Sequence, residues 1–453
     1  LISFAGTFAV LQNIIAEFEA KEEIKIPTRK LTQEENLLFY YMNNERSVTV
    51  TQEITLAEPI DFDKMQYALT LTIKRFPYFK VKVEKHGDSM CFVHNEKPIQ
   101  LYHKYMERSV FNSENNNGFL FRFEVDGDKL YMNNAHLLTD GRGKLPLVQT
   151  LLTFYYGLMG IENTSNLHSR YLSFPEDINL EWENPFKHLP KEDIQVEMPK
   201  KEGKPCYRLQ FEHDSKRRTF VHAIEVPVDD MMSYCKKVGG TPNTVIAAGL
   251  ASAIAHCNQD FNEDENDINI GVIIDTKPAL DTDLSSINAF AMAKLTFNKE
   301  STVLSQEEKH SQLKTSLRSQ ATPEMMMNDA KNLAAVASMI LALPTVEERQ
   351  AMANDIVTSA FKKEVTAAIS YAGQSKLGDI SSNVKSVMAI VESSIFDLLV
   401  EVNCLDNVFC ITMMQSFDSV KYMFAMKRYL QELGMRYYDN GSRIISQVPF
   451  ILK

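Results

Sequence analysis

One short segment of the 453-residue chain combines residue types that can do acid–base chemistry. Residues 136–141 read His-Leu-Leu-Thr-Asp-Gly. An imidazole changes its protonation near neutral pH, so His136 is a candidate general base. Asp140 and Gly141 are typical turn residues, because an Asp side chain bonds the nearby backbone and Gly adopts angles that other residues resist. Taken alone, this pattern also fits a structural histidine beside a turn.

Two other chemistries fit the segment less well. His136 and Asp140 could bind a metal ion as a pair, but no third ligand stands nearby at a useful spacing, so we expect no metal. Residues 141–144, Gly-Arg-Gly-Lys, are not a phosphate-binding loop. Such a loop needs a longer spacing between its glycines and a Lys-Ser or Lys-Thr ending.

The neighbouring elements are expected to place His136 at the end of a strand. Strands are predicted over 119–125 and 130–135, and Asp126-Gly127 between them is a strong hairpin signal. The apolar periodicity of 145–158 predicts a helix after the turn. A histidine between a strand and a turn can be held rigidly and still project into a cleft.

The rest of the chain reads as mixed α and β. In the first half, a strand is expected over 47–57 and a helix over 61–75, which stops before Pro77. The second half is expected to contain a sheet and several helices. The strands of that sheet are predicted at 365–370, 384–390, 398–403 and 408–414, and the helices at 228–238, 242–256, 302–348 and 419–433.

Prolines divide the chain into two parts of comparable size. Residues 181–205 contain four prolines and many Lys and Glu residues, which is typical of an interdomain linker. We therefore expect an N-terminal subdomain over 1–180, a linker over 181–205 and a C-terminal subdomain over 206–453. A chain of this length suits two domains better than a single core.

Composition narrows the class of function. The net charge is −11 and no long basic run occurs, so we expect no nucleic-acid partner. No apolar run reaches the roughly 18 residues that a transmembrane helix needs. The six cysteines are scattered without a metal or disulfide spacing, so reduced thiols and a cytoplasmic location are expected.

Residues 136–141 resemble the His-His-x-x-x-Asp-Gly motif of the coenzyme-A-dependent acyltransferase superfamily, and most closely its alcohol O-acetyltransferase and condensation-domain-like branch. Further segments resemble that branch in the expected order. They lie at 29–35, 75–80, 119–122, 241–248 and 370–378. The Asp-Phe-Gly-Trp-Gly segment of the BAHD enzymes is absent from the sequence, which argues against that branch.

The sequence departs from the family pattern at two positions. Ala135 stands where the motif has its first histidine, whereas His136 matches the second, on which the family's chemistry rests. Lys80 replaces the second arginine of the segment at 75–80. In condensation domains that arginine pairs with the motif aspartate, so Lys80 is expected to form a weaker ion pair with Asp140, because lysine lacks the two-pronged guanidinium.

The resemblance implies a chloramphenicol-acetyltransferase-like α+β fold. Each of its two subdomains is a mixed sheet with flanking helices, and the active-site channel lies between them. His136 would be the general base, with Asp140, Gly141 and Lys80 in structural roles at the site. The reaction would move an acyl group, with acetyl favoured, from acyl-CoA to the hydroxyl of a small alcohol or to an amine. Acyl-CoA would be a co-substrate with no permanently bound cofactor, and a monomer is expected.

Two alternatives stay open at this stage. The chain could be a condensation-type enzyme that forms amides from carrier-protein thioesters. It could also be a non-catalytic binding homologue, a reading to which Ala135 and Lys80 lend weight. The sequence identifies neither the acceptor nor the donors that would stabilise the oxyanion.

Overall fold

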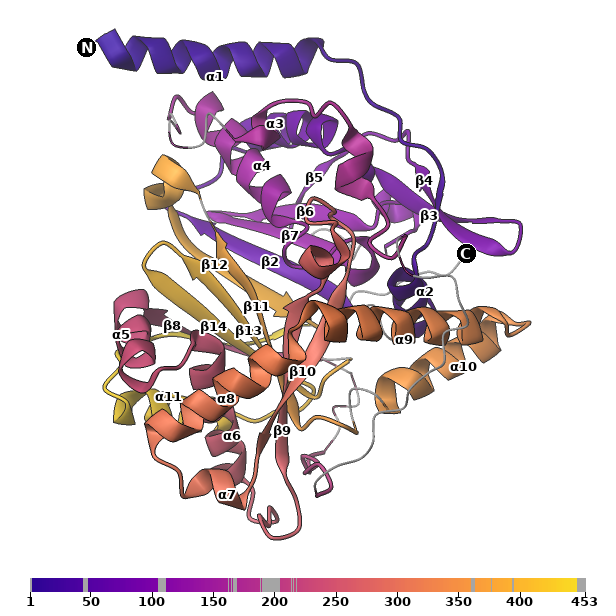
Figure 1. The fold of residues 1–453 in the computed structure, drawn as a ribbon. Coiled ribbons are helices and arrows are strands. Elements are labelled where there is room, and N and C mark those ends of the chain that lie inside the picture. Colours follow the sequence, from indigo (N-terminus) through magenta and orange to yellow (C-terminus); the bar gives the residue numbers. More distant parts are fainter. Residues whose placement is uncertain are drawn as a thin grey trace.

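The computed structural model describes residues 2–43, 48–104, 111–161, 163, 165, 169–187, 189, 204–212, 214, 216, 218–359, 363–375, 377–392 and 395–445, with the backbone alone for 2–9. Within these ranges the chain forms three sheets flanked by helices (Figure 1). The expected mixed α+β class is confirmed. Helices lie at both ends of the molecule and the two larger sheets lie between them.

The first large sheet has five strands in the order β12-β2-β7-β6-β5. Their bounds are β2 (Thr49–Leu56), β5 (Leu101–His103), β6 (Phe121–Asp126), β7 (Lys129–Ala135) and β12 (Val384–Val391). β6 and β7 form the predicted hairpin, in which Asp126 pairs with Lys129 and Gly127 has a φ of 60°. A smaller sheet, in the order β1-β4-β3, is formed by β1 (Arg29–Lys30), β3 (Val81–His86) and β4 (Ser89–His94).

The second large sheet has seven strands in the order β10-β9-β11-β13-β14-β8-β15. Their bounds are β8 (Thr219–Pro227), β9 (Ile268–Asp275), β10 (Phe290–Phe297), β11 (Ala367–Ser375), β13 (Leu398–Leu405), β14 (Val408–Gln415) and β15 (Tyr438–Ile445). β11 runs parallel to both of its neighbours and the other pairs are antiparallel. The sheet is therefore mixed, as expected.

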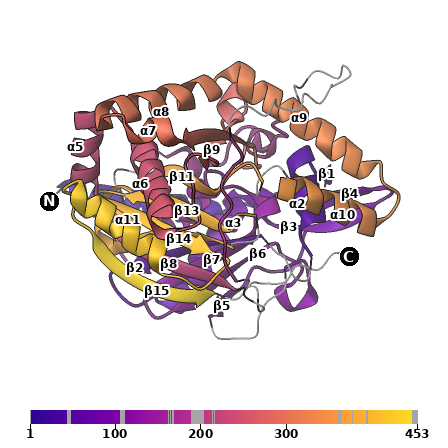
Figure 2. The same cartoon turned by 90° about the horizontal axis from the view of Figure 1, so that it is seen from below.

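Helices pack against both large sheets (Figure 2). Those of the first half are α1 (Ile2–Ala20), α2 (Gln33–Tyr41), α3 (Phe62–Arg75) and α4 (Leu145–Leu158). Those of the second half are α5 (Val228–Val238), α6 (Pro242–Cys257), α7 (Lys299–Thr302), α8 (Gln306–Gln320), α9 (Pro323–Leu341), α10 (Val346–Val357) and α11 (Lys421–Glu432). α6 begins as its sequence predicts, with Thr241 as the N-cap and Pro242 in its first turn.

The two large sheets meet across an apolar layer. Val50 of β2 and Val391 of β12 pack in one cluster with Val221 of β8, Leu399 of β13 and Met414 of β14. Alternate residues of β13 point the other way, since Val400 and Val402 pack in a cluster with residues of α5, α6 and α11. Both faces of β13 are therefore buried.

One expected strand lies in the other sheet. The sequence grouped 384–390 with the strands of the second half, and this grouping is wrong, because β12 pairs antiparallel with β2 in the five-stranded sheet. An apolar pattern shows that a strand is buried, but it does not identify the strand beside it. The second half of the sequence thus completes the sheet of the first half.

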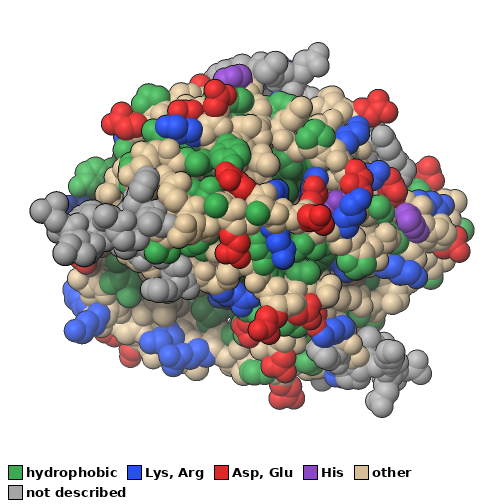
Figure 3. Space-filling model, turned by 90° about the horizontal axis from the view of Figure 1, so that it is seen from above, with side chains coloured by type: hydrophobic (Ala, Val, Ile, Leu, Met, Phe, Trp, Pro, Cys, Tyr) green, Lys and Arg blue, Asp and Glu red, His purple; other side chains and the backbone are tan. Residues whose placement is uncertain are grey.

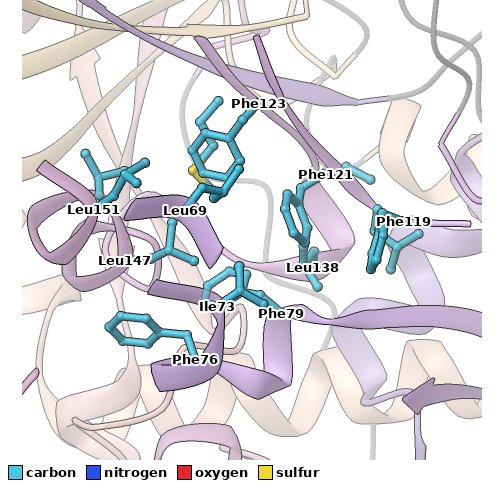
Figure 4. Packing of buried hydrophobic residues seen from close by; sticks show 14 of the residues in the cluster. Leu69, Ile73, Phe76, Phe79, Phe119, Phe121, Phe123, Leu138, Leu147 and Leu151 are labelled. Carbon is cyan, nitrogen blue, oxygen red and sulfur yellow. The ribbon is translucent and has the colours of Figure 1, made fainter. Parts of the chain in front are cut away.

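A dense aromatic and aliphatic core lies beneath α3 and α4. Figure 4 shows Leu69 and Ile73 of α3, Leu147 and Leu151 of α4, and the phenylalanines around them. Leu138 lies beside Phe121 in the same core. The residues just after His136 are therefore anchored in the hydrophobic interior of the first half.

Acidic and basic side chains are interspersed on the face seen in Figure 3. Among the described residues, no single helix is both long and apolar enough to cross a membrane, and α5 and α6 reach that length and composition only as a pair bent by 89°. All six cysteines are free thiols.

Candidate active site

His136 begins a single 3-10 turn, His136–Leu138, directly after β7. Its backbone N–H donates to the carbonyl of Val48 at 3.0 Å. The two leucines that follow are buried in the core of the first half. The backbone at His136 is therefore fixed on both sides, while the side chain itself stays partly exposed to a cavity.

Asn288 holds the imidazole from the other half of the chain. The side-chain Nδ2 of Asn288 donates to the carbonyl of His136 at 2.5 Å, and its Oδ1 lies 3.1 Å from Nδ1 of His136. Since an amide oxygen can only accept, Nδ1 carries the proton in the neutral imidazole. Nε2 then bears the free lone pair, and it makes no hydrogen bond to any described residue.

The charge state of His136 follows from its surroundings. Burial lowers the pKa of His136 below its ordinary value, and the nearby charge of Lys144 acts in the same direction. The carbonyl of His136 itself, the charge of Asp140 and the bond with Asn288 oppose this effect without overcoming it. His136 is therefore neutral at pH 7, the form in which it can accept a proton.

Asp140 braces the turn after His136. Its Oδ1 accepts from the backbone N–H of Gly143 at 2.6 Å, and its Oδ2 forms an ion pair with Lys277. Lys277 lies in the 3-10 turn Lys277–Leu280 after β9 and is buried. Burial alone would lower the pKa of Lys277, but Asp140 and Asp275 outweigh it and raise that pKa, so the lysine stays charged.

The expected ion pair between Lys80 and Asp140 is wrong. Lys80 pairs with Glu23 at 2.5 Å and does not line the cavity beside His136. The cation that faces Asp140 comes instead from Lys277 in the second half of the chain. The family resemblance predicted a cation opposite Asp140, but it indicated Lys80 and missed Lys277.

Two glycines let the turn lie close to the second half. A Cβ at Gly141 would stand 3.2 Å from the Cβ of Ala372 on β11. A Cβ at Gly143 would overlap the carbonyl of Ser286 and the hydroxyl of Thr139. A larger residue at Gly143 would thus require the backbone at Ser286 or the turn itself to shift.

A chain of polar contacts runs from this turn to a buried ion pair. Thr139 donates its hydroxyl to the carbonyl of Ser286 at 2.7 Å, and Ser286 donates its N–H and its hydroxyl to the carbonyl of Glu181. The carboxylate of Glu181 is clamped by two hydrogen bonds from Arg75, at 2.7 and 2.8 Å. Glu181 was expected to open a linker, and it is instead 1% exposed.

His136 and Asp140 line a cavity of about 380 Å³. Its walls come from both halves of the chain and from both large sheets. They are largely apolar and include Leu37, Val50, Ile273, Phe290, Val336 and Phe396. Apolar walls with a few polar groups are typical of sites for small ligands.

Several ionisable residues in this cavity were not predicted. Glu34 of α2 is buried, with its Oε2 3.4 Å from the N–H of Phe290 and no partner for Oε1 among the described residues. Burial, aided by the charge of Asp140, holds the pKa of Glu34 well above its usual range. Lys144 and Glu401 line the cavity as well. A sequence signal existed for Glu401, because it and Asn403 interrupt a strand whose other residues are apolar.

Three other histidines and a methionine-rich helix in the second half could also suggest a site. His222 bonds Ser442 and the carbonyl of Ser419, and His256 is exposed; His213 falls outside the described residues. Met326 is buried, Met325 and Met339 are exposed, and none of them lines the cavity. Among the described residues no group of three or more His, Cys, Asp or Glu side chains could hold a metal ion. A second cavity, of about 640 Å³, lies among α5, α6, α8 and α11, away from His136.

Comparisons with known proteins place this fold. No protein-family model matches the sequence, and no curated protein matches it either. A trichothecene 15-O-acetyltransferase from Fusarium sporotrichioides has a similar structure, with a TM-score of 0.60, 13% identity and coverage of 90% of this chain and 95% of that chain. TRI101 from F. graminearum, solved with coenzyme A and deoxynivalenol, gives a TM-score of 0.59, 11% identity and coverage of 91% and 100%.

A third similar structure is the condensation domain of the monacolin K polyketide synthase MokA, with a TM-score of 0.57, 13% identity and coverage of 90% of this chain and 97% of that domain. The shared architecture covers nearly the whole of each chain. The protein therefore has the two-lobed α+β fold of these acetyltransferases and condensation domains.

Proposed function

We propose that this protein is an acyltransferase that moves an acyl group, with acetyl favoured, from a coenzyme A thioester to the hydroxyl of a small acceptor. The observation that carries the proposal is the setting of His136. Its Nδ1 is held by Asn288, its Nε2 is free, and its side chain lines a cavity between the two sheets. Structural neighbours that include acetyltransferases, one of them solved with coenzyme A, support the choice of donor.

In this mechanism His136 is the general base. As the acceptor oxygen forms its bond to the thioester carbon, Nε2 of His136 takes the proton from the acceptor hydroxyl. The tetrahedral intermediate then collapses, the carbon–sulfur bond breaks, and the imidazolium returns its proton to the departing thiolate. No acyl-enzyme is needed, because the thioester is already activated. Asp140 acts as a structural brace through Gly143 and Lys277.

The intermediate carries a negative oxygen that needs hydrogen-bond donors held in place. Glu34 lines the same cavity as His136, and its burial beside the charge of Asp140 raises the pKa of its carboxyl well above the usual range, which favours the protonated form. A neutral carboxyl in an apolar site can donate one hydrogen bond to an oxyanion. We assign this role to Glu34, whose Oε1 has no partner among the described residues.

The pH dependence of the reaction tests the role of Asn288. Since only neutral imidazole accepts a proton, kcat/KM rises as pH rises through the pKa of His136, and the lowered pKa places this acid limb below pH 6.5. Asn288→Asp puts a carboxylate beside Nδ1, which raises that pKa, so the limb moves to higher pH by on the order of one unit. Profiles from pH 5 to 9 measure this shift, with Asn288→Leu as the uncharged control. If the acid limbs of the kcat/KM profiles of wild type and Asn288→Asp coincided, the contact between residue 288 and Nδ1 of His136 would be contradicted.

The main alternative is a condensation-type enzyme, and the similarity to the MokA condensation domain favours it. The acyl donor distinguishes the two proposals. Acetyl-CoA and an acetylated phosphopantetheinyl carrier protein are offered at equal concentration with a panel of alcohols and amines. We expect acceptor-dependent thiol release from acetyl-CoA and ester products. Release from the carrier alone, with amide products, would favour the alternative. No transfer from either donor would favour a non-catalytic homologue, as Ala135 and Lys80 first suggested.

A further inference from the structure

A second group of polar side chains lines the cavity, apart from those that hold His136. It consists of Lys144 just before α4, Glu401 and Asn403 on β13, and Ser370 on β11. Lys144 is 2% exposed and Asn403 is 4% exposed. We call these four residues the polar wall. Apart from the effect of the Lys144 charge on the pKa of His136, they do not contribute to the mechanism proposed above.

The strand register explains why these residues share one side. Side chains two residues apart on a strand point the same way, so Leu399, Glu401 and Asn403 face the five-stranded sheet. Ser370 pairs with Glu401 across β11 and β13. The turn that carries Lys144 is pressed against β11 where Gly141 meets Ala372. The polar wall is therefore built from rigid elements.

Two donors of the polar wall have no hydrogen-bond partner among the described residues. Nζ of Lys144 and the side-chain Nδ2 of Asn403 are buried and make no hydrogen bond to any described residue. Ser370, the register partner of Glu401, lowers the pKa of that carboxyl, and no ion pair joins Glu401 to Lys144 in the described part of the chain. A buried unsatisfied polar group costs about 1–3 kcal/mol, and a charged one costs more. A fold that keeps two such donors beside a cavity is suited to a ligand that accepts from them.

We propose that a substrate of this site carries a carboxylate, which Lys144 and Asn403 bind while its hydrocarbon part lies along the apolar walls. The inference rests on the proposed function for the reaction, but the binding can be measured without turnover. The carboxylate belongs either to the acceptor, as in a hydroxy acid, or to the acyl group, as in a succinyl thioester. Both sources present the same chemistry to the polar wall.

The neighbouring charges are compatible with an anionic ligand. Burial lowers the pKa of Lys144 to about 8, against the charges of Glu401 and Asp140, so the ammonium is largely protonated at pH 7. Burial raises the pKa of Glu401 to about 7, against the opposing effects of Ser370 and of the charge of Lys144. Glu401 can thus take up a proton when a carboxylate binds to Lys144. Binding should tighten as pH falls from 8.5 to 6.

Octanoate and octanamide are a matched pair of probes, because they share length and shape and differ in charge. By calorimetry at pH 7 with the full chain, we expect wild type to bind octanoate at least tenfold more tightly than octanamide. Lys144→Met should abolish this preference. Glu401→Gln, which removes a competing negative charge, should preserve or increase it. Lys237→Met, an exposed lysine that lines the other cavity, serves as the control for simple loss of charge.

Folding of the key variant is checked by thermal unfolding. Lys144→Met removes an unpaired buried charge, so its melting temperature should equal or exceed that of wild type. An equal affinity of wild type for the two probes, or a preference that survives in Lys144→Met, would overturn the proposal. A preference lost together with a lower melting temperature would also count against it, because the lysine would then be structural.

Kinetics distinguish the two sources of the carboxylate. If it belongs to the acceptor, Lys144→Met raises KM for 8-hydroxyoctanoate but not for 1-octanol; if it belongs to the acyl group, KM rises for succinyl-CoA but not for acetyl-CoA. Either result supports carboxylate binding by the polar wall. Unchanged KM values for all four substrates would overturn that proposal. His136→Ala should keep the octanoate preference. If octanoate binds as expected but neither wild type nor Lys144→Met transfers an acyl group, the proposed function fails and the proposed carboxylate site stands.

Discussion

Replacing His136 with alanine is expected to lower kcat/KM for acyl transfer by about 10³-fold, within the range that general-base catalysis supplies. The variant loses the one imidazole in the described part of the cavity wall. It keeps the backbone bonds of residue 136 to Val48 and Asn288, and the two leucines that follow stay in the core. The melting temperature should therefore fall by only a few degrees.

Steady-state kinetics and thermal unfolding of the same preparations measure this effect. His256→Ala is the matched control, because His256 is an exposed histidine on α6, outside the cavity. It should retain the wild-type rate. Undiminished turnover by His136→Ala would remove His136 from the mechanism. A rate loss accompanied by a large fall in melting temperature would indicate a structural histidine instead.

Arg75→Met is expected to cause the largest loss of stability, about 3–5 kcal/mol. Arg75 and Glu181 are 0% and 1% exposed, and the arginine makes two hydrogen bonds to the carboxylate. Without it, the partners of the buried carboxylate in the described part of the chain are Tyr78 and the partly exposed Arg170. Denaturant unfolding measures the loss. The double variant Arg75→Met/Glu181→Leu should recover much of it, since it removes both charges; no recovery would contradict the account.

The pH dependence of this ion pair has a definite sign. Burial alone would raise the pKa of Glu181, but the bonds from Arg75, Arg170 and Tyr78 outweigh it and lower that pKa. A lowered folded-state pKa contributes stability above the unfolded value of about 4.3, and this stability is lost as pH falls through the folded-state pKa. The stability gap between wild type and Arg75→Met should therefore narrow below about pH 4. If the stability difference between the two proteins did not change with pH, the ionisation of Glu181 would be excluded as its cause.

Local patterns predicted many elements of the fold. The hairpin at Gly127 and the helices over 145–158 and 228–238 were all expected from the sequence, because turn chemistry and periodicity act over a few residues. α2 and β15 were missed. α2 is buried nearly all round, and its apolar residues show little helical periodicity. β15 is a largely exposed edge strand with a glycine in its interior.

Long-range contacts could not be predicted in the same way. The segment 136–141 indicated His136, Asp140 and Gly141, but their partners Asn288 and Lys277 lie more than a hundred residues later in the chain. Nothing in the sequence marks Asn288 as different from other loop asparagines. The resemblance suggested Lys80 as the partner of Asp140, whereas its charge is directed to Glu23. The position of β12 depends in the same way on contacts between the two halves.

The most direct test of the proposed reaction is acyl transfer from acetyl-CoA by the wild-type chain. Free thiol and acylated product are measured together, over a panel of small alcohols that includes hydroxy acids, in parallel with His136→Ala. We predict that at least one alcohol accelerates thiol release by wild type, that an equal amount of ester forms, and that His136→Ala lacks both. If no alcohol accelerated thiol release and no ester formed, acyl transfer to an alcohol would be contradicted. If both proteins formed equal amounts of ester, the role of His136 would be contradicted.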